Sequence, residues 1–385
     1  MSSIKLVELS SSPTGENKSW ILVYLVGSLG DTIVCIPALE AIRRQFPDEK
    51  IILLHDYQTL VPVSPLDIIP KNLVDGSLSY VMRRGLLPKL AEFYRLRKII
   101  KQQKVKAVIY LVASERFGWL VWRDKLFFQL CGIENLIGFY PFSKKEQYER
   151  DSFDKPILKS SEAVLKLQRL ERDGIDIQNL NFTNQLLQFS EAEKRHVKDW
   201  LNARRQNTNA RLVAMCPGCK RAANDWGIEN FIEIGKRLLA DGKSEIIIVG
   251  GKAEKPLAAK MIEAWGSGID ATGEFAANES GALFAHCEFM FGNDTGTTHL
   301  AAAAGIPCVA VYHFRDNPGH WFPLGRGHLL IQHDVECAGC HLTTCPKPLH
   351  PCMTGIEVDD VWRLLTEFMA EQRTEAAPAY KRVLI

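Results

Sequence analysis

A short glycine-rich segment that ends in an aspartate is the first candidate for chemistry. Gly27-Ser28-Leu29-Gly30-Asp31 follows the apolar run 21–26 and opens a helical pattern. Gly27 and Gly30 allow a tight turn and the close approach of a ligand, while Asp31 projects from the helix start near Ser28. Its carboxylate could remove a proton as a general base or cap the helix, and the motif alone leaves both roles open.

A second segment, residues 292–300, combines an acidic residue with small and hydroxylated residues before an alanine-rich helix. Such a helix start presents N–H groups and the positive end of the helix dipole, which favours a diphosphate. A carboxylate repels phosphate, so we expect Asp294 to orient the loop, cap the helix or bond a sugar hydroxyl. A capped core helix without a ligand is the alternative. The candidate binding residues are Asp294, Thr295, Gly296, Thr297 and His299.

A third segment, residues 216–226, places two cations directly after another predicted strand. Its candidate binding residues are Lys220, Arg221 and Asn224. The whole chain has 47 Lys and Arg against 45 Asp and Glu, so its net charge of +2 does not draw it as a whole to nucleic acid or to an anionic membrane. An anion must therefore be held locally, unless this segment is only a solvated loop.

Four of the ten cysteines fall between residues 337 and 352. Four soft ligands in one loop suit a tetrahedral zinc or iron ion in a closed, structural site that leaves no vacant position for catalysis. The alternative is a loop of reduced thiols packed under the last predicted helix, residues 357–371. The candidate ligands are Cys337, Cys340, Cys345 and Cys352, with His333, His341 and His350 nearby in the sequence.

Apolar strand-like runs alternate with helical patterns in two passages, which predicts two parallel, doubly wound α/β halves. In the first passage the predicted strands are 21–26, 51–54, 107–112 and 136–140, and the helices are 36–46, 87–102 and 161–172. In the second passage the strands are 211–216, 245–249, 289–292 and 308–312, and the helices are 191–205, 228–239, 254–265, 280–286, 297–304 and 357–371.

The length of 385 residues exceeds the roughly 250 to 300 residues that one hydrophobic core supports. Residues 173–209 lose the alternation, so we place the connection between the halves there. The predicted domains are residues 1–190 and 191–385, and the second carries the cysteine-rich loop 337–352. Ligands of such folds bind at the carboxyl ends of the strands, so we expect the site in a cleft between the two sheets.

The sequence predicts neither a signal peptide nor a membrane span. Residues 1–19 contain no uninterrupted apolar run of the about 7 to 15 residues that a signal peptide needs. The longest apolar runs, 105–113 and 246–251, are far shorter than the roughly 20 residues of a membrane span. We therefore expect a cytosolic protein in which the cysteines stay reduced.

The three segments, taken in order, resemble glycosyltransferase family 9, the family of ADP-heptose:lipopolysaccharide heptosyltransferases. The resemblance extends from about residue 20 to residue 370. The residues that carry it are 21–31 with Pro37-Ala38-Leu39, the segment 217–226, the segment 292–296 with His299-Leu300-Ala301-Ala302, Gly305-Ile306-Pro307 and Trp321-Phe322-Pro323.

This resemblance implies a GT-B architecture, with an N-terminal Rossmann-like domain for the acceptor and a C-terminal one for the nucleotide-sugar. It also implies inverting transfer in one displacement, without an organic cofactor. Asp31 then becomes the general base on an acceptor-side loop with Gly27, Ser28 and Gly30. The loop 294–298, with His299 close behind it, becomes the site for the donor diphosphate and sugar. Some similar proteins hold iron through such cysteines.

The donor implied by the resemblance is ADP-heptose, and the acceptor is a cell-envelope glycolipid such as the lipopolysaccharide core, or else a protein. Two details of the donor side are specific to this chain. Asn224-Asp225 stands where the family often has Lys-Arg, so Lys220 or Arg221 would have to supply the cation. Glu254 is similar to an acidic family position that bonds ribose hydroxyls, but it could equally complement a helix dipole.

A lipid acceptor would require a peripheral approach to the inner membrane. Residues 83–87 and 116–122 combine cations with apolar side chains and are candidate contacts, with ordinary helix or core packing as the alternative. A non-catalytic nucleotide-sugar or metal-binding protein on the same scaffold is a second hypothesis. A nicotinamide-dependent dehydrogenase is disfavoured because neither half has G-x-G-x-x-G after its first strand. The sequence gives no indication of the oligomeric state.

Overall fold

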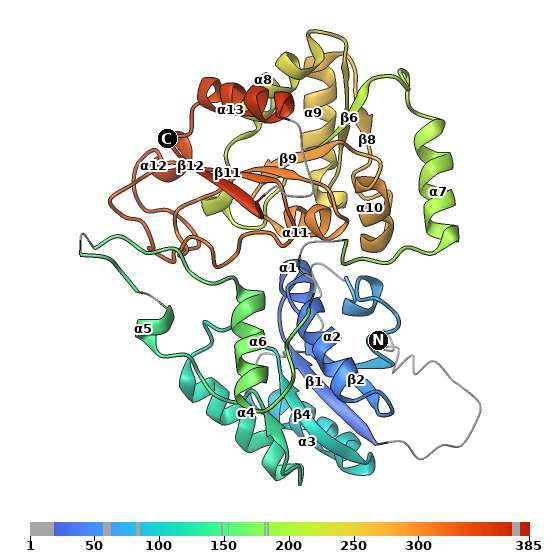
Figure 1. Cartoon of the computed structure of the whole chain (residues 1–385), viewed down its shortest axis with the longest axis vertical. Coiled ribbons are helices and arrows are strands. Elements are labelled where there is room, and N and C mark those ends of the chain that lie inside the picture. Colours follow the sequence, from blue (N-terminus) through green and yellow to red (C-terminus); the bar gives the residue numbers. More distant parts are fainter. Residues whose placement is uncertain are drawn as a thin grey trace. The chain divides into compact units, whose positions relative to one another are not determined.

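The structure, a computed structural model, describes residues 19–56, 63–81, 85–147, 149–152, 154–180, 182, 185–371 and 378–385. The chain divides into two compact units (Figure 1). The first contains residues 1–149 and 160–181, and the second contains residues 150–159 and 182–385. Each unit is built around its own parallel sheet, which confirms the predicted α/β class.

The first sheet has five parallel strands in the order β3-β2-β1-β4-β5. Its central strand β1 (Trp20–Leu25) is a continuous apolar run because both faces of a parallel sheet are covered, and Ile21, Leu22 and Val23 are fully buried. The order reverses between β1 and β4, where such folds bind ligands. The other strands are β2 (Lys50–Asp56), β3 (Gly76–Tyr80), β4 (Val105–Tyr110) and β5 (Leu136–Ile137).

Two long helices, α3 (Leu86–Gln102) and α4 (Gly118–Leu130), cover one face of this sheet. Leu96 of α3 and Phe128 of α4 are buried in one apolar cluster with side chains of β1, β2 and β4. The remaining helices of the first unit are α1 (Leu29–Ile33), α2 (Ile36–Gln45), α5 (Lys144–Gln147) and α6 (Glu162–Arg172), with a 3-10 turn η1 (Pro65–Asp67).

Helix α6 brings three charged side chains into the interior of the first unit. Glu162, Lys166 and Arg169 are almost completely buried. Lys166 Nζ lies 2.8 Å from Glu162 Oε1 and donates to Leu111 O at 2.6 Å. Glu162 accepts a hydrogen bond from Ser114 N at 2.9 Å. These contacts attach α6 to the segment that follows β4, at the position where the strand order reverses.

The second sheet has seven parallel strands in the order β12-β11-β10-β9-β6-β7-β8, and this order reverses between β6 and β9. The strands are β6 (Arg211–Cys216), β7 (Ser244–Ile248), β8 (Ile269–Asp270), β9 (Phe289–Asn293), β10 (Cys308–Val311), β11 (His328–Gln332) and β12 (Tyr380–Leu384).

The main core of the second unit lies between this sheet and helices α8, α9 and α13, because each helix places one apolar face against the strands. These helices are α8 (Ile228–Leu239), α9 (Lys255–Trp265) and α13 (Val358–Ala370). The unit also contains α7 (Glu191–Asn202), α10 (Ala277–Phe284), α11 (Gly296–Ala303), α12 (Pro351–Thr354) and the 3-10 turns η2 (Ala222–Asn224) and η3 (Lys252–Glu254).

Some strands and helices were not predicted from the sequence, namely β3, β8, β11, β12, α4, α5 and α12. The second unit also contains residues 150–159 and 182–190, whereas the predicted first domain included both segments. Arg150 Nη2 donates to Ala338 O at 3.0 Å and Lys159 N donates to Pro318 O at 2.7 Å, which explains the assignment of the first segment. None of the helices within the described ranges has both the length and the apolar composition needed to cross a membrane.

The buried pair on α6 gives a stability prediction. Lys166→Met removes the cation beside a buried carboxylate, so we expect it to destabilise the chain by about 3 to 5 kcal/mol. Glu162→Gln/Lys166→Met removes both charges and should be more stable than the single variant. Urea unfolding followed by circular dichroism measures both, with Lys194→Met in an exposed pair as the control that should change little. Equal midpoints for the single and double variants would contradict the prediction.

Candidate active site

The loop after β1 places Asp31 in the first turn of α1. Gly27 has φ +143°, and a Cβ on this residue would lie 2.3 Å from Asp31 Cγ, so the position requires glycine. Ser28 donates to Asp31 Oδ2 from its backbone N at 2.7 Å and from its Oγ at 3.1 Å. Oδ1 of Asp31 has no hydrogen-bond partner in the described part of the chain. One carboxylate oxygen thus caps the helix, and the other is available to accept a proton.

Two further contacts hold this loop against the first sheet. Gly27 N donates to Oδ1 of Asp56, the last residue of β2, at 3.1 Å. The buried thiol of Cys35 lies 3.1 Å from Asp31 O. Burial raises the pKa of Cys35 to about 12, so the thiol keeps the proton that it donates. The backbone that carries Asp31 is therefore fixed at both ends of the turn.

In the second unit, buried side chains join the loops that follow β6 and β9. Asn293, the last residue of β9, donates from Nδ2 to Pro217 O at 2.8 Å and accepts from Trp226 N at 3.3 Å. Asn224, on the β6 loop, donates from Nδ2 to Asp294 O at 2.9 Å. Asn224, a predicted binding residue, thus bonds the neighbouring loop through its amide. These three bonds fix the two loops to each other where the strand order reverses.

The side chain of Asp294 is oriented by a histidine that follows the next strand, β10. His313 Nε2 lies 2.9 Å from Asp294 Oδ2, and both side chains are buried. His313 Nδ1 accepts a hydrogen bond from Arg315 N at 3.3 Å, which places the ring proton on Nε2, the nitrogen that lies near the carboxylate. Asp294 therefore orients its loop, which is one of the three roles considered for it.

The start of α11 follows directly after Asp294 and remains partly accessible. Thr295, Gly296 and Thr297 are half-buried, and the hydroxyls of the two threonines lie 2.6 Å apart. The first turn, whose residues are all described, contains no acidic side chain, and the N-cap Thr295 makes no side-chain capping bond. His299 is buried one turn further on, with its ring edge-on to Trp321. This helix start presents backbone N–H groups that suit an anion.

The remaining donor-side candidates lie on the loops after β6 and β7. Lys220 and Arg221 are exposed on the β6 loop. Glu254 Oε2 accepts a hydrogen bond from Gly251 N at 2.7 Å, so this carboxylate caps its own turn. A Cβ at Gly218 would lie 2.4 Å from Glu254 Cγ, which means that only glycine leaves room for Glu254 beside the β6 loop. All the donor-side candidates of the sequence therefore occupy one edge of the second sheet.

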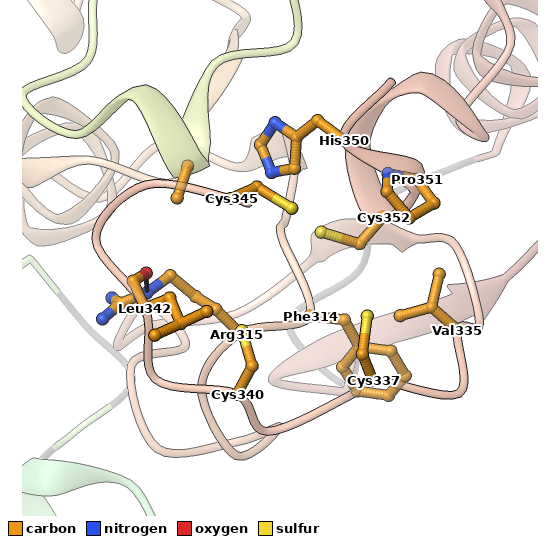
Figure 2. A pocket seen from close by; sticks show the side chains of 11 residues that line it. Phe314, Arg315, Val335, Cys337, Cys340, Leu342, Cys345, His350, Pro351 and Cys352 are labelled. Carbon is orange, nitrogen blue, oxygen red and sulfur yellow. Dashed lines mark hydrogen bonds between the residues drawn. The ribbon is translucent and has the colours of Figure 1, made fainter. Parts of the chain in front are cut away.

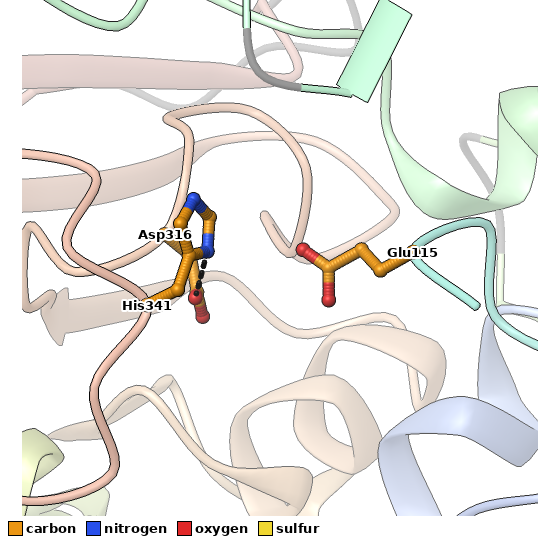
Figure 3. Close-up of side chains that lie close together, drawn as sticks. All are labelled: Glu115, Asp316 and His341. Carbon is orange, nitrogen blue, oxygen red and sulfur yellow. Dashed lines mark ion pairs between the residues drawn. The ribbon is translucent and has the colours of Figure 1, made fainter. Parts of the chain in front are cut away.

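Polar contacts continue from His313 to the cysteine-rich loop. Arg315 Nη1 lies 3.0 Å from Asp316 Oδ2, and its Nη2 donates to His341 O at 3.0 Å. His341 Nδ1 lies 3.4 Å from Asp316 Oδ1 (Figure 3). Burial would raise the pKa of Asp316, but the bond from His341 and the nearby His313 and Arg315 lower it to about 2. The ionised carboxylate therefore holds the two loops together at neutral pH.

The four cysteines of this loop line one small cavity of about 20 Å³, together with His350 (Figure 2). All four are free cysteines, and the sulfurs of Cys345 and Cys352 point toward each other. Burial raises the pKa of the Cys352 thiol, and the neighbouring cysteines contribute to the rise. Within the described ranges, no three of the sulfurs lie within 4.8 Å of one another, so the thiols form an open arrangement.

Three residues of this site, His313, Arg315 and Asp316, were not predicted from the sequence. They belong to no sequence motif, because their contacts are with residues of loops that are distant in the sequence, such as Asp294 and His341. His313 nevertheless follows a predicted strand, so the rule that ligands gather at the carboxyl ends of strands could have indicated it.

Known proteins resemble this chain over most of its length. Lipopolysaccharide heptosyltransferase 3 of Escherichia coli is 22% identical over 300 residues, which cover 75% of this chain and 82% of that protein. The solved structure of E. coli ADP-heptose LPS heptosyltransferase II has a TM-score of 0.63 at 17% identity, and the match covers 91% of this chain and 98% of that chain.

A third similar structure is that of the iron-containing dodecameric glycosyltransferase TibC from enterotoxigenic E. coli H10407. Its TM-score is 0.52 at 14% identity, covering 92% of this chain and 77% of that one. At these identities the structural matches show the fold, which is that of GT-B heptosyltransferases. The family model described as glycosyltransferase family 9 (heptosyltransferase) matches residues 125–350, a range that includes both loops at the edge of the second sheet. Since this match spans more than half of the sequence, the chain belongs to glycosyltransferase family 9, the heptosyltransferases.

Proposed function

We propose that this glycosyltransferase transfers heptose from ADP-heptose, with inversion, to a lipopolysaccharide or lipooligosaccharide core on the cytoplasmic side of the inner membrane. The observation that carries the proposal is the pair of cross-linked loops after β6 and β9, which leaves the start of α11 accessible to an anion. The names of the similar proteins, an ADP-heptose LPS heptosyltransferase among them, support this choice of donor and acceptor.

In the proposed reaction, Asp31 Oδ1 accepts the proton of an acceptor hydroxyl. The hydroxyl oxygen attacks the anomeric carbon of the heptose from the face opposite the diphosphate. The bond from that carbon to the diphosphate oxygen breaks, and ADP departs with the bonding electrons. The hydrogen bonds from Ser28 to Oδ2 keep the carboxylate in one orientation during the proton transfer.

On the donor side, we assign the diphosphate to the backbone N–H groups and hydroxyls of Thr295, Gly296 and Thr297. Negative charge grows on the departing ADP, so N–H donors and one cation from the β6 loop would stabilise the transition state. Glu254 lies beside Gly218 and Gly250, on the loops that follow β6 and β7, and would contact the nucleoside ribose. The proposed diphosphate site is supported by three buried residues, Asn224, Asp294 and His299.

Two other functions remain as alternatives to the proposed one. A protein acceptor would leave the donor side unchanged and would differ only in the first unit. A non-catalytic nucleotide-sugar protein is favoured by the Asn224-Asp225 pair in place of the family's Lys-Arg. Release of ADP from ADP-heptose in the presence of a core glycolipid, or of a candidate protein, separates these possibilities.

The role of Asp31 is tested by Asp31→Asn, which keeps the oxygen that accepts from Ser28 but cannot take a proton. We expect turnover of ADP-heptose to fall by about 10² to 10⁴-fold, as is typical on loss of a general base. Donor affinity, measured by calorimetry with ADP-heptose, should not change. The matched control is Asp56→Asn, a carboxylate that contacts the same loop through Gly27. Turnover of Asp31→Asn equal to that of the control would contradict the assignment.

The cation that contacts the diphosphate is identified by comparing Lys220→Ala with Arg221→Ala. Loss of a charge-assisted hydrogen bond should weaken ADP binding by about 10- to 100-fold in one variant and little in the other. Lys236→Ala, an exposed cation on α8, is the control. If neither loop variant binds ADP more weakly than the control does, the cationic contact lies elsewhere.

We further propose that Cys337, Cys340, Cys345 and Cys352 hold one structural zinc or iron ion. Four thiols around a cavity of about 20 Å³ offer a suitable donor set for a metal ion. A cavity of this volume has room for roughly one water molecule, and so for a single ion. The iron named in the TibC structure supports iron as one candidate. When bound, the metal would join both ends of the loop, and no step of the transfer requires it.

Elemental analysis of the purified chain should find about one zinc or iron per molecule. Cys340→Ser/Cys345→Ser should lose the metal and unfold at a lower temperature, because the loop loses its cross-link. Cys219→Ser, a partly exposed thiol on the β6 loop, should keep it. A metal content below about 0.2 per chain without chelators would favour a loop of reduced thiols.

A further inference from the structure

Helix α3 carries an apolar stripe on its outer side. Leu87, Leu90 and Tyr94 recur at helical spacing, and Leu87 and Tyr94 are 78% and 67% exposed. The same helix buries Leu96 and Ile100 in the core of the first unit, so its packing toward the sheet is already satisfied. The outer stripe therefore has a different use from core formation.

Helix α4 carries a second outer stripe with larger side chains. Trp119 and Trp122 are 65% and 66% exposed, and Leu126 and Leu130 continue the same face toward the end of the helix. The inner side buries Val121 and Phe128. Tryptophan and tyrosine beside leucine is the composition found where proteins meet the boundary between water and lipid.

The two stripes form one continuous surface, which we call the α3–α4 face. Phe93 of α3 and Phe127 of α4 are in edge-to-face contact, with ring centroids 4.6 Å apart. Arg97 Nε of α3 donates to Leu130 O at 3.1 Å. Figure 1 shows the two helices next to each other in the first unit. A monomeric soluble protein seldom exposes so many large apolar side chains in one place.

The charges on these helices are strongly unbalanced, although the whole chain carries only +2. The two helices contain seven Lys and Arg but only two acidic residues, Glu92 and Asp124. Both acids are paired with arginines, Glu92 with Arg95 and Asp124 with Arg123. Lys89, Lys98 and Lys101 are exposed beside the apolar stripe. The α3–α4 face is thus apolar at its centre and basic around it.

We propose that the α3–α4 face docks on a membrane surface that contains anionic phospholipids. The apolar side chains would enter the boundary between headgroups and acyl chains, while the lysines contact phosphate groups. The basic surroundings argue against a second copy of this chain as the occupant, because a two-fold contact would bring like charges together. This inference does not depend on the donor, the acceptor or the role of Asp31.

Sedimentation of the whole chain with vesicles tests the proposal. The chain should bind vesicles made of equal parts of phosphatidylglycerol and phosphatidylcholine. It should bind vesicles of pure phosphatidylcholine more weakly, and high salt should weaken its binding to the mixed vesicles. Leu87→Ser/Leu130→Ser should lower the partition coefficient by about tenfold. Leu158→Ser/Leu384→Ser, with comparable exposure outside the α3–α4 face, is the matched control and should bind as the unchanged chain does. Circular dichroism checks that each variant is folded.

A second measurement reports the depth of insertion. Lipids with brominated acyl chains should quench tryptophan fluorescence of the unchanged chain, and Trp119→Ser/Trp122→Ser should lose most of this quenching. The proposal is overturned if the unchanged chain does not bind anionic vesicles, or if both leucine variants bind equally. It is also overturned if ultracentrifugation finds a dimer that only Leu87→Ser/Leu130→Ser dissociates, because a second copy then covers the face.

Discussion

The contact between the Asp294 carboxylate and the His313 ring organises the proposed donor side of the second unit. A buried carboxylate is costly without a nearby partner, and His313 Nε2 lies 2.9 Å from Asp294 Oδ2. Asp294 continues into α11, and His313 continues into Arg315 and Asp316, which hold the cysteine-rich loop. One buried pair therefore links the start of α11 on one side to the cysteine-rich loop on the other.

Each unit has an aspartate at the position where its strand order reverses, yet the two carboxylates are suited to different tasks. Asp294 is buried and lies beside His313, so its carboxyl group orients the loops of the protein itself. Asp31 is only partly buried, and its Oδ1 has no partner within the described ranges. A general base must come within hydrogen-bond distance of the proton that it removes. Asp31 is the more accessible of these two carboxylates, which is why we propose it, and not Asp294, as the general base.

The sequence predicted most of the elements whose side chains face the core, since apolar periodicity reflects burial, although the buried strand β11 was missed. The strands β1, β6 and β9 and the loops after them were found because each joins an apolar run to a glycine-rich turn. Strand β12 was missed because it is partly exposed and carries Lys381 and Arg382, and α4 was missed because it is apolar on its outer side as well. The roles of His313 and Asp316 could not be read from the sequence, because they arise only when distant loops meet.

The contacts of the cysteine-rich loop explain how it keeps its backbone conformation. The proposed transfer needs no metal, yet the loop keeps four cysteines around one cavity and holds three non-glycine residues at positive φ, namely His341, Leu349 and His350. Such backbone persists only where other contacts impose it. Gly339 N donates to Phe314 O at 2.8 Å and His341 N donates to Arg315 O at 2.9 Å, directly after His313 in the chain. A metal that stiffened this loop would thus affect the proposed donor site through His313 and Asp294. It would limit the motion of these side chains and would not take part in the transfer reaction.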